Sequence, residues 1–464
     1  MYTYTYITIL DWLVSALLVP IIYWIAIGLR NKWYPEGHPW RAYFIPALTV
    51  KIIGSVFIGL LYMYYYGGGD TYEYHRQAQV INHSFFDSPA KWIKLILHTA
   101  NWYDGDTYDY ISKMPFYQTT ANYYVCSIAA LLGLIVGSFY LPTAILFAVF
   151  SFTGIWALFR TFSHIYPSYT KQLSVAILFF PSVVLWGSGL LKDSICMLGL
   201  GWLTYGAFQM LINGNFSLKN ILWTFFCAYL VFIIKIYILA AFFPALIFWI
   251  LATYVGKIQN PVVRLALNVS VPVLAAFIFI LIANSFKEAL GGYSLDSVLK
   301  SSQILRTELY KTSLESDGSA YNLGEIDPHF PGIFLKAPAA INVTLYRPYV
   351  WEVRNPIMLL SALESLTLAI ITIYIFAKNG IKNVFSIISK NPDLQFFILF
   401  TLIFAFATGI STYNFGSLSR YKIPCMPFIG MTLMILWDHA NQTKLDIIKK
   451  RQSTDNSTNS ISFT

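Results

Sequence analysis

The chain has 464 residues, of which only 11% are charged, whereas an ordinary soluble domain carries roughly 25%. Hydrophobic residues make up 57% of the sequence and aromatic residues 18%, which excludes a water-soluble fold and indicates a polytopic membrane protein. In a membrane protein, a net charge of +9 first reflects the excess of basic residues in cytoplasmic loops. It therefore does not predict binding to nucleic acid. The four cysteines lie in apolar stretches without CxxC spacing, which excludes a zinc site and a disulfide framework and predicts small buried residues.

Windows of about 20 apolar residues predict an all-α fold, a polytopic transmembrane helix bundle of about 11–13 spans. The predicted spans lie near residues 7–29, 43–66, 121–138, 141–161, 172–190, 193–213, 219–235, 236–255, 263–285, 356–378, 394–412 and 423–438. They predict a single integral-membrane domain over residues 1–440. The tail, residues 441–464, is rich in Ser, Thr and Asn and is predicted to be disordered.

Two segments, about 67–120 and 286–355, remain outside the spans and are expected on the outer face with short interfacial helices. Basic residues mark the 30–42 loop and the C-terminal tail as cytoplasmic. The topologies predicted from the two ends of the chain conflict. Two segments on the same face must be separated by an even number of spans, whereas seven predicted spans lie between these two outer segments. The misassigned span is expected within 219–255 or in the closely spaced pair before Arg160.

The first outer segment contains a near-repeat, in which Gly69 to Tyr74 and Gly105 to Tyr110 share five of six residues. The first copy follows a predicted span and three glycines, so its backbone can turn tightly at the membrane surface. Asp70, Glu73 and Asp106 are therefore candidates for acid-base chemistry or cation binding at this boundary. The alternative is an ordinary interfacial loop whose tyrosines belong to the aromatic belt. Between the copies, Pro89 to Trp102 has the pattern of a helix lying in the interface.

Charged residues also occur close to predicted spans. Lys192 and Asp193 follow an apolar stretch broken by small residues, and Lys235 interrupts another. Such charges persist where they are paired, face a water-filled cavity or bind a phosphate, so all three are candidate phosphate-binding residues. The alternatives are a capped helix start for the first two and a short loop for Lys235. Asp11 and Lys51, near the middle of the first two spans, are expected to pair with each other.

The second outer segment re-enters the membrane through Leu345 to Pro356. Aromatic anchoring explains its Tyr and Trp residues, whereas Arg347 opposes the positive-inside bias and could bind a phosphate through its planar guanidinium. Glu352 is grouped with this candidate phosphate site. Glu364, inside the next span, is an intramembrane acid whose partner is expected to be a cation from this stretch. Arg420 and Tyr421 form a basic turn before the last span and join the phosphate-binding candidates.

Carboxylates can deprotonate an acceptor hydroxyl, and fixed cations can stabilise a departing phosphate. The pattern therefore favours glycosyl transfer from a lipid-linked donor. Three motifs add to the features above: Pro115-Phe116-Tyr117, the Trp186 to Asp193 block and the Arg420 to Pro424 motif. On these motifs and features together, the chain resembles the GT-C type integral-membrane glycosyltransferases, which use polyprenyl-phosphate sugars. That resemblance implies that Asp70 is the general base, with Asp106 or Glu73 second. Two predicted spans precede Asp70, whereas that family usually has one.

The Gly-Asp-x-x-x-Tyr block after the second span is also similar to exopolysaccharide polymerases of the Wzy type, which join lipid-linked repeat units. Both resemblances imply a lipid-linked sugar donor, a glycan, lipid or protein acceptor, and a plasma-membrane location such as the bacterial inner membrane. A divalent cation is compatible with this chemistry, but the sequence shows no decisive ligand set. A lipid or oligosaccharide transporter is the non-enzymatic alternative, although no internal repeat supports it.

Overall fold

The computed structural model describes residues 7–102, 104–255, 258–260, 263, 266, 270, 319–324 and 332–439. In these residues the fold is all-α, as predicted, and the one β-type pairing is an isolated bridge between Ala320 and Asn414. Seven helices in the described part are long and apolar enough to cross a membrane, which agrees with a multi-pass membrane protein. The predicted span 263–285, most of the second outer segment and the tail 441–464 lie largely or wholly outside the described residues.

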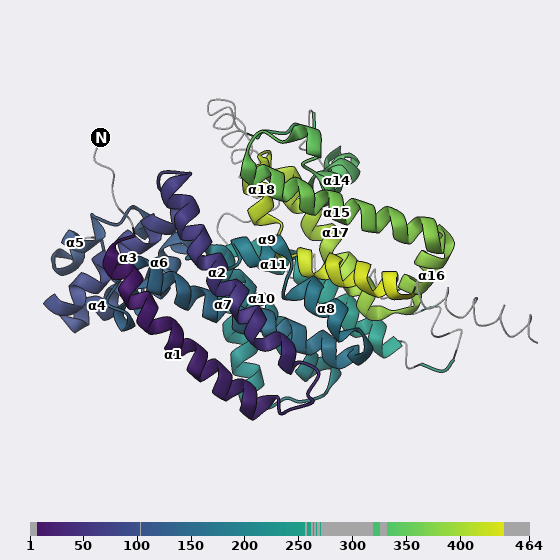
Figure 1. The fold of residues 1–464 in the computed structure, drawn as a ribbon, viewed down its shortest axis with the longest axis horizontal. Helices are drawn as coiled ribbons and strands as arrows, with labels where there is room; N and C mark the ends of the chain where they lie inside the picture. Colours follow the sequence, from purple (N-terminus) through teal and green to yellow (C-terminus); the bar gives the residue numbers. More distant parts are fainter. Residues whose placement is uncertain are drawn as a thin grey trace, which may run out of the picture. The chain divides into compact units, whose positions relative to one another are not determined.

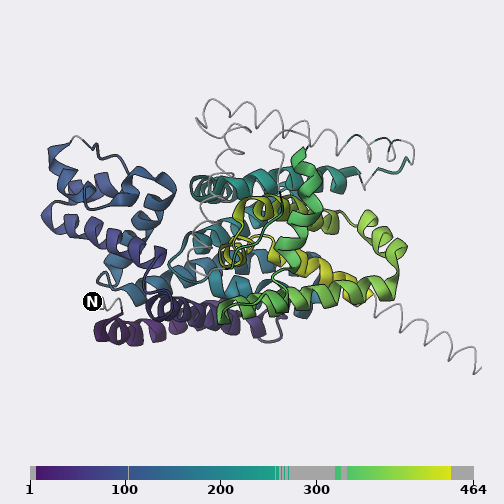
Figure 2. The ribbon, with the colours of Figure 1, turned by 90° about the horizontal axis from the view of Figure 1, so that it is seen from above.

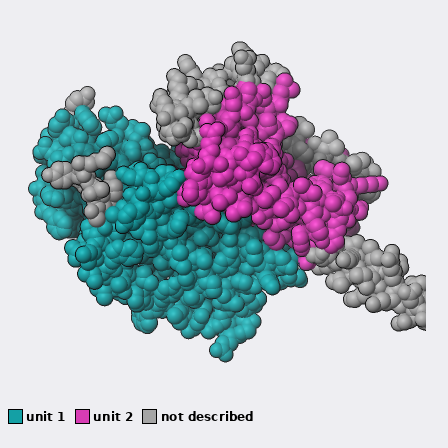
Figure 3. Space-filling model, turned by 45° about the horizontal axis from the view of Figure 1, so that its top comes forward, with its two compact units in different colours: residues 1–243 teal, residues 244–464 magenta. Residues whose placement is uncertain are grey.

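The chain divides into two compact units, Met1–Phe243 and Pro244–Thr464, which Figure 3 shows in different colours. The prediction of one integral-membrane domain over residues 1–440 stays a prediction.

Unit 1 begins with two spans and a polar helical region (Figure 1). Its helices are α1 (Ile9–Trp33), α2 (Arg41–Tyr64), α3 (Asp70–Asp87), α4 (Pro89–Ile96), α5 (Gly105–Ile111), the 3-10 turn η1 (Pro115–Gln118), α6 (Thr120–Ile135), α7 (Tyr140–Ile165), the 3-10 turn η2 (Pro167–Tyr169), α8 (Thr170–Ile177), α9 (Pro181–Trp186), α10 (Lys192–Ala207), the π-helical turn η3 (Phe208–Ile212) and α11 (Leu218–Val255), whose last part belongs to unit 2. Helices α3, α4 and α5 gather at one end of this unit in both ribbon views (Figures 1 and 2).

Helix α7 forms the centre of unit 1, because it packs against α1, α2, α6, α8 and α10. Its closest approach is to α10, where Gly154 of α7 and Gly201 of α10 lie backbone to backbone. Small residues at a helix crossing let two backbones approach within direct van der Waals contact, the main source of helix association inside a membrane. Helix α1, in contrast, leaves most of its apolar side chains exposed, as expected for a helix that faces lipid.

Three predicted spans differ from the observed helices. Residues 172–190 do not form one helix, because Pro181 starts a new short helix and Gly187 follows its last residue, leaving α8 and α9 as separate pieces. The predicted spans 219–235 and 236–255 form one element, α11, whose backbone is non-helical at Lys235 (φ −148°, ψ 75°). Residues 219–255 are one of the two stretches in which the odd number of predicted spans indicates a misassigned span. All four cysteines are buried, as predicted.

Unit 2 is built on two long antiparallel spans joined by a short helix (Figure 1). Its elements are the 3-10 turn η4 (Gly332–Lys336), α14 (Ala337–Tyr346), the 3-10 turn η5 (Val350–Glu352), α15 (Pro356–Asn379), α16 (Ile381–Lys390), α17 (Pro392–Thr412), α18 (Phe415–Tyr421) and a further helical stretch over 426–439. Helix α14 packs on α17, where Gly409 lies directly against the Ala340 backbone and Thr344 donates a hydrogen bond to the Ala405 carbonyl (2.8 Å).

We expect Gly201→Ala to destabilise unit 1, because a Cβ at this position would overlap the carbonyl group of Gly154. Forcing packed elements apart costs about 1–3 kcal/mol, and thermal unfolding of the purified protein in detergent would measure the loss. The control is Gly28→Ala on α1, where a Cβ meets nothing within 4 Å. An equal loss of stability in both variants, or none in Gly201→Ala, would contradict the close α7–α10 crossing.

Candidate functional site

Asp70, the predicted general base, is the first residue of α3 and is exposed. It follows span α2 through Gly67, Gly68 and Gly69, whose φ angles are +68°, +137° and +121°. L-residues with a side chain rarely adopt such angles, and a Cβ at Gly69 would also meet the Tyr62 ring at 3.0 Å. The glycine turn therefore lets the chain leave the span and begin a new helix at once, with Asp70 at the junction.

Helix α3 is held firmly against the apolar part of unit 1. Three hydrogen bonds from its first two turns make this contact: Thr71 with the Tyr140 hydroxyl (2.8 Å), Tyr72 to the Gly59 carbonyl (2.7 Å) and His75 with the Ser138 carbonyl (2.9 Å). Burial lowers the pKa of His75 to about 4, so its ring is neutral at physiological pH. Asp70 therefore projects from a rigid element, which is how a catalytic group keeps its geometry.

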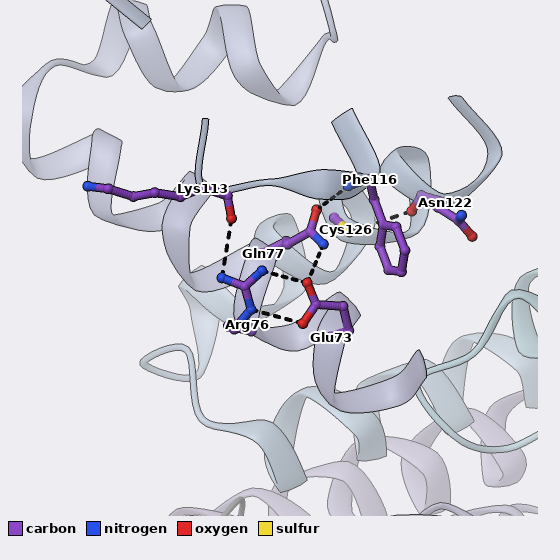
Figure 4. Close-up of polar contacts among 7 residues, drawn as sticks. All are labelled: Glu73, Arg76, Gln77, Lys113, Phe116, Asn122 and Cys126. Carbon is purple, nitrogen blue, oxygen red and sulfur yellow. Dashed lines mark hydrogen bonds and ion pairs between the residues drawn. The ribbon is translucent and has the colours of Figure 1, made fainter. Parts of the chain in front are cut away.

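Glu73, one turn further along α3, is held by two neighbours (Figure 4). Its carboxylate forms an ion pair with Arg76 (2.5 Å) and accepts a hydrogen bond from the Gln77 side chain (2.6 Å). Arg76 also donates to the Lys113 carbonyl (3.2 Å), and the Gln77 side-chain oxygen accepts from the Phe116 N–H (3.1 Å). The hydrogen bond from Arg76 outweighs burial and lowers the pKa of Glu73. Because this carboxylate is charged and engaged, its geometry suits a positioning residue better than a general base.

The second copy of the near-repeat also begins a helix but has different surroundings. Asp104 caps α5 by accepting the Asp106 N–H (3.3 Å), and Lys94 pairs with Asp104 (3.2 Å). Asp106 itself is exposed on this short helix. Tyr72 is buried in the first copy, whereas its counterpart Tyr108 is 48% exposed. The two copies of the repeat therefore share their position at the start of a helix, but they do not form two equivalent sites.

Lys235 and Asp193 form a buried ion pair at 2.5 Å, with side chains 6% and 1% exposed. The pair joins the first turn of α10 to the non-helical residue of α11. Lys192, the first residue of α10, is half-buried. Charged side chains near a membrane core persist where they are paired with one another, as Asp193 and Lys235 are here. Phosphate binding by these three residues stays a prediction.

The expected pairing of Asp11 with Lys51 is wrong, because each finds a nearer backbone partner. Asp11 accepts hydrogen bonds from the Leu141 N–H (3.0 Å) and from Thr8 at the start of α1. Lys51 is 1% exposed and donates to the Gly187 (2.7 Å) and Val183 (3.1 Å) carbonyls. Lys51 thus binds the carboxyl end of the short helix α9, where the Gly187 carbonyl also accepts a hydrogen bond from Ser151 (2.6 Å).

In unit 2, Arg347 forms an ion pair with Glu352, and each side chain is 20% exposed. The guanidinium carbon also lies 5.2–5.9 Å from the ring centres of Tyr321, Tyr349 and Phe415. Burial raises the pKa of Glu352, but the hydrogen bonds from Arg347 and the Tyr349 N–H outweigh it, so the pKa is lowered. Nε and Nη2 of Arg347 donate to Glu352, and Nη1 donates to no residue in the described part of the chain.

Glu364 forms an ion pair with Lys422 at 3.6 Å, and both side chains are buried. Lys422 also lies 3.4 Å from the Ser365 hydroxyl, which in turn donates to the Arg347 carbonyl (3.0 Å). Arg420 and Tyr421, in the last turn of α18, are half-buried. Lys422 was missed as a functional candidate, although it directly follows the Arg420-Tyr421 motif.

The predicted site residues fall into both units. Unit 1 contains Asp70, Glu73, Asp106, Lys192, Asp193 and Lys235, and unit 2 contains Arg347, Glu352, Arg420 and Tyr421. The described contacts bring Asp193 to Lys235 and Arg347 to Glu352. Sequence reasoning missed Arg76 and Gln77, although helical spacing from Glu73 (i+3 and i+4) could have found them. Among the residues that the structure describes, no group of three His, Cys, Asp or Glu residues could hold a metal ion.

Comparison with family models, with curated proteins and with solved structures finds no match to this chain.

A double-mutant cycle tests whether the buried pair is structural. We expect Asp193→Leu and Lys235→Met each to destabilise the protein by roughly 3–5 kcal/mol, because each leaves a buried charge without its partner. The double variant should recover most of this loss in thermal unfolding. If the pair binds a donor phosphate, the double variant should be stable but inactive. If the two single losses simply add in the double variant, the ion pair is not the stabilising contact.

Proposed function

We propose that this protein is an integral-membrane glycosyltransferase that transfers a hexosyl or pentosyl group from a polyprenyl-phosphate-linked donor on the outer face of the membrane. The observation that carries the proposal is the position of Asp70, an exposed carboxylate at the start of α3 and one glycine turn beyond span α2. The acceptor is a glycan, lipid or protein. The context would be polysaccharide biosynthesis in the cell envelope, in a plasma membrane such as the bacterial inner membrane, with the C-terminus cytoplasmic.

The chemistry needs a base beside the membrane surface. A polyprenyl tail stays in the bilayer, so the anomeric carbon of its sugar is presented close to the lipid-water boundary. Asp70 would accept the proton of the acceptor hydroxyl while the new C–O bond forms and the bond to the donor phosphate breaks, the electron pair leaving with the phosphate. Glu73, engaged by Arg76 and Gln77, would fix the first turns of α3. Asp106 remains the second candidate for the base.

Arg347 is the best candidate in unit 2 for the donor phosphate. Its guanidinium is held on one side by Glu352 and surrounded by aromatic rings, while Nη1 donates to no described residue. A planar guanidinium oriented in this way suits a phosphate, whose developing charge it would stabilise. Lys192, Arg420 and Tyr421 are further candidates for this role.

Two alternatives differ in what they predict. A Wzy-type polymerase would use the same base but join lipid-linked repeat units. A lipid or oligosaccharide transporter is favoured by one observation, the interruption between α9 and α10 together with the break at Lys235 in α11, since broken helices are typical of transporter binding sites. A transporter does not need a base at Asp70.

We expect Asp70→Asn to lower glycosyl transfer about a hundredfold or more, because a general base contributes that much. Mass and length profiles of lipid-linked and surface glycans, from cells with matched protein levels, measure the effect. One missing sugar supports a monosaccharide transferase, whereas full repeat units that fail to lengthen support a polymerase. The control is Asp109→Asn, an exposed acid of the second copy, which should retain activity. A normal profile in Asp70→Asn would remove Asp70 as the base and favour the transporter.

For the phosphate role, Arg347→Ala should reduce donor use more than Arg347→Lys, since lysine keeps the charge but not the planar pair of N–H groups. The dependence of transfer rate on donor concentration measures this effect. Glu352→Gln is the companion variant, because it keeps the guanidinium and removes its charged partner. Normal donor dependence in both Arg347 variants would end this assignment.

A further inference from the structure

Helix α16 joins the two antiparallel spans α15 and α17 and is fixed at both ends. It begins after Gly380, whose φ of +74° permits a sharp turn out of α15. At its other end, the Gln395 side chain of α17 donates to the carbonyls of Ile388 (3.1 Å) and Ser389 (2.8 Å). These bonds hold the last turn of α16 against α17, where the Ile388 carbonyl also accepts the Asn391 N–H (3.1 Å). The position of α16 is thus set by the two spans.

The two faces of α16 have opposite character. Ile381, Val384, Phe385 and Ile388 follow the i, i+3, i+4 and i+7 spacing of one helix face. Val384 is buried against the protein, but Ile381 and Phe385 are 65% and 60% exposed. The other face carries Lys382, Ser386, Ser389 and Lys390, and both lysines are exposed.

The charged residues of the chain segment that contains α16 are all lysines. Between Glu364 and Asp393 the sequence contains Lys378, Lys382 and Lys390 and no acid. Lys378, at the end of α15, donates to the Tyr374 hydroxyl (2.7 Å). Lys382 and Lys390, by contrast, lie on the polar face of α16.

Both α15 and α17 qualify as membrane spans, so the helix that joins their ends lies where they leave the bilayer. There the exposed apolar side chains would meet acyl chains, and the lysines would lie at the depth of the lipid phosphates. This is the geometry of an interfacial amphipathic helix. Basic residues at this depth attract anionic lipids and not zwitterionic ones.

We propose that α16 is a binding surface for the headgroups of anionic phospholipids, with Lys382 and Lys390 as the phosphate ligands and Ile381 and Phe385 as the apolar anchor. This proposal does not rest on the proposed glycosyl transfer. Its occupant is the anionic lipid of the surrounding leaflet. A soluble anion would satisfy the lysines but would leave the two exposed apolar side chains in water.

Native mass spectrometry of the full-length protein in neutral detergent tests the proposal. The protein is offered equal amounts of phosphatidylglycerol and phosphatidylcholine with the same acyl chains. We expect wild type to retain phosphatidylglycerol preferentially, and Lys382→Gln/Lys390→Gln to lose about fivefold of this preference for each lysine removed. Phe385→Ser should weaken retention of both lipids, because it removes part of the apolar anchor.

The matched control is Lys171→Gln/Lys219→Gln, which removes the same charge from exposed positions outside α16. It should keep the wild-type preference, and size-exclusion profiles confirm that all variants are folded. An equal loss in this control would show that only net charge matters and would overturn the proposal. So would absence of a preference in wild type, or displacement of the lipid by inorganic phosphate at the same concentration.

Discussion

A polar group inside a membrane must find its partner within the protein, because hydrocarbon offers none. Lys51 illustrates the constraint, since its ammonium group binds the carbonyls of Val183 and Gly187 where helix α9 ends. The same carbonyls also accept hydrogen bonds from the Ser151 hydroxyl (2.6 Å, to Gly187) and from the Gly187 N–H (3.1 Å, to Val183), so the break between α9 and α10 is bound by several donors. The break in the helix therefore supplies the acceptors that the buried Lys51 ammonium group needs.

The same constraint accounts for the other buried charges. Asp193 meets Lys235 at the one non-helical residue of α11, and Glu364 meets Lys422 near the start of the last helical stretch. In each case, a charge near the end or break of a helix is matched by one from another element. These contacts cross between helices that are distant in sequence, so they fix how the helices of each unit pack.

Composition and apolar windows were sufficient to predict an all-α membrane fold, because lipid permits few other structures. They could not predict that residues 172–190 break at Pro181 and Gly187, or that 219–255 is one element, because window averages smooth over single residues. The pairing of Asp11 and Lys51 failed for a related reason. Depth within a span can be read from the sequence, but the rotation of a helix, which decides the partner, depends on packing between distant segments.

The near-repeat shows what sequence similarity could and could not reveal about the site. Both copies begin a helix with an exposed aspartate, but only the first follows a span directly and is hydrogen-bonded to the apolar part of unit 1 through Thr71 and Tyr72. Glu73 lies one turn away and is already engaged by Arg76. Residue type named three carboxylates, whereas the structure gives each different surroundings. Glu73 is held by Arg76, Asp106 lies on the short helix α5, and Asp70 begins α3 directly after the glycine turn.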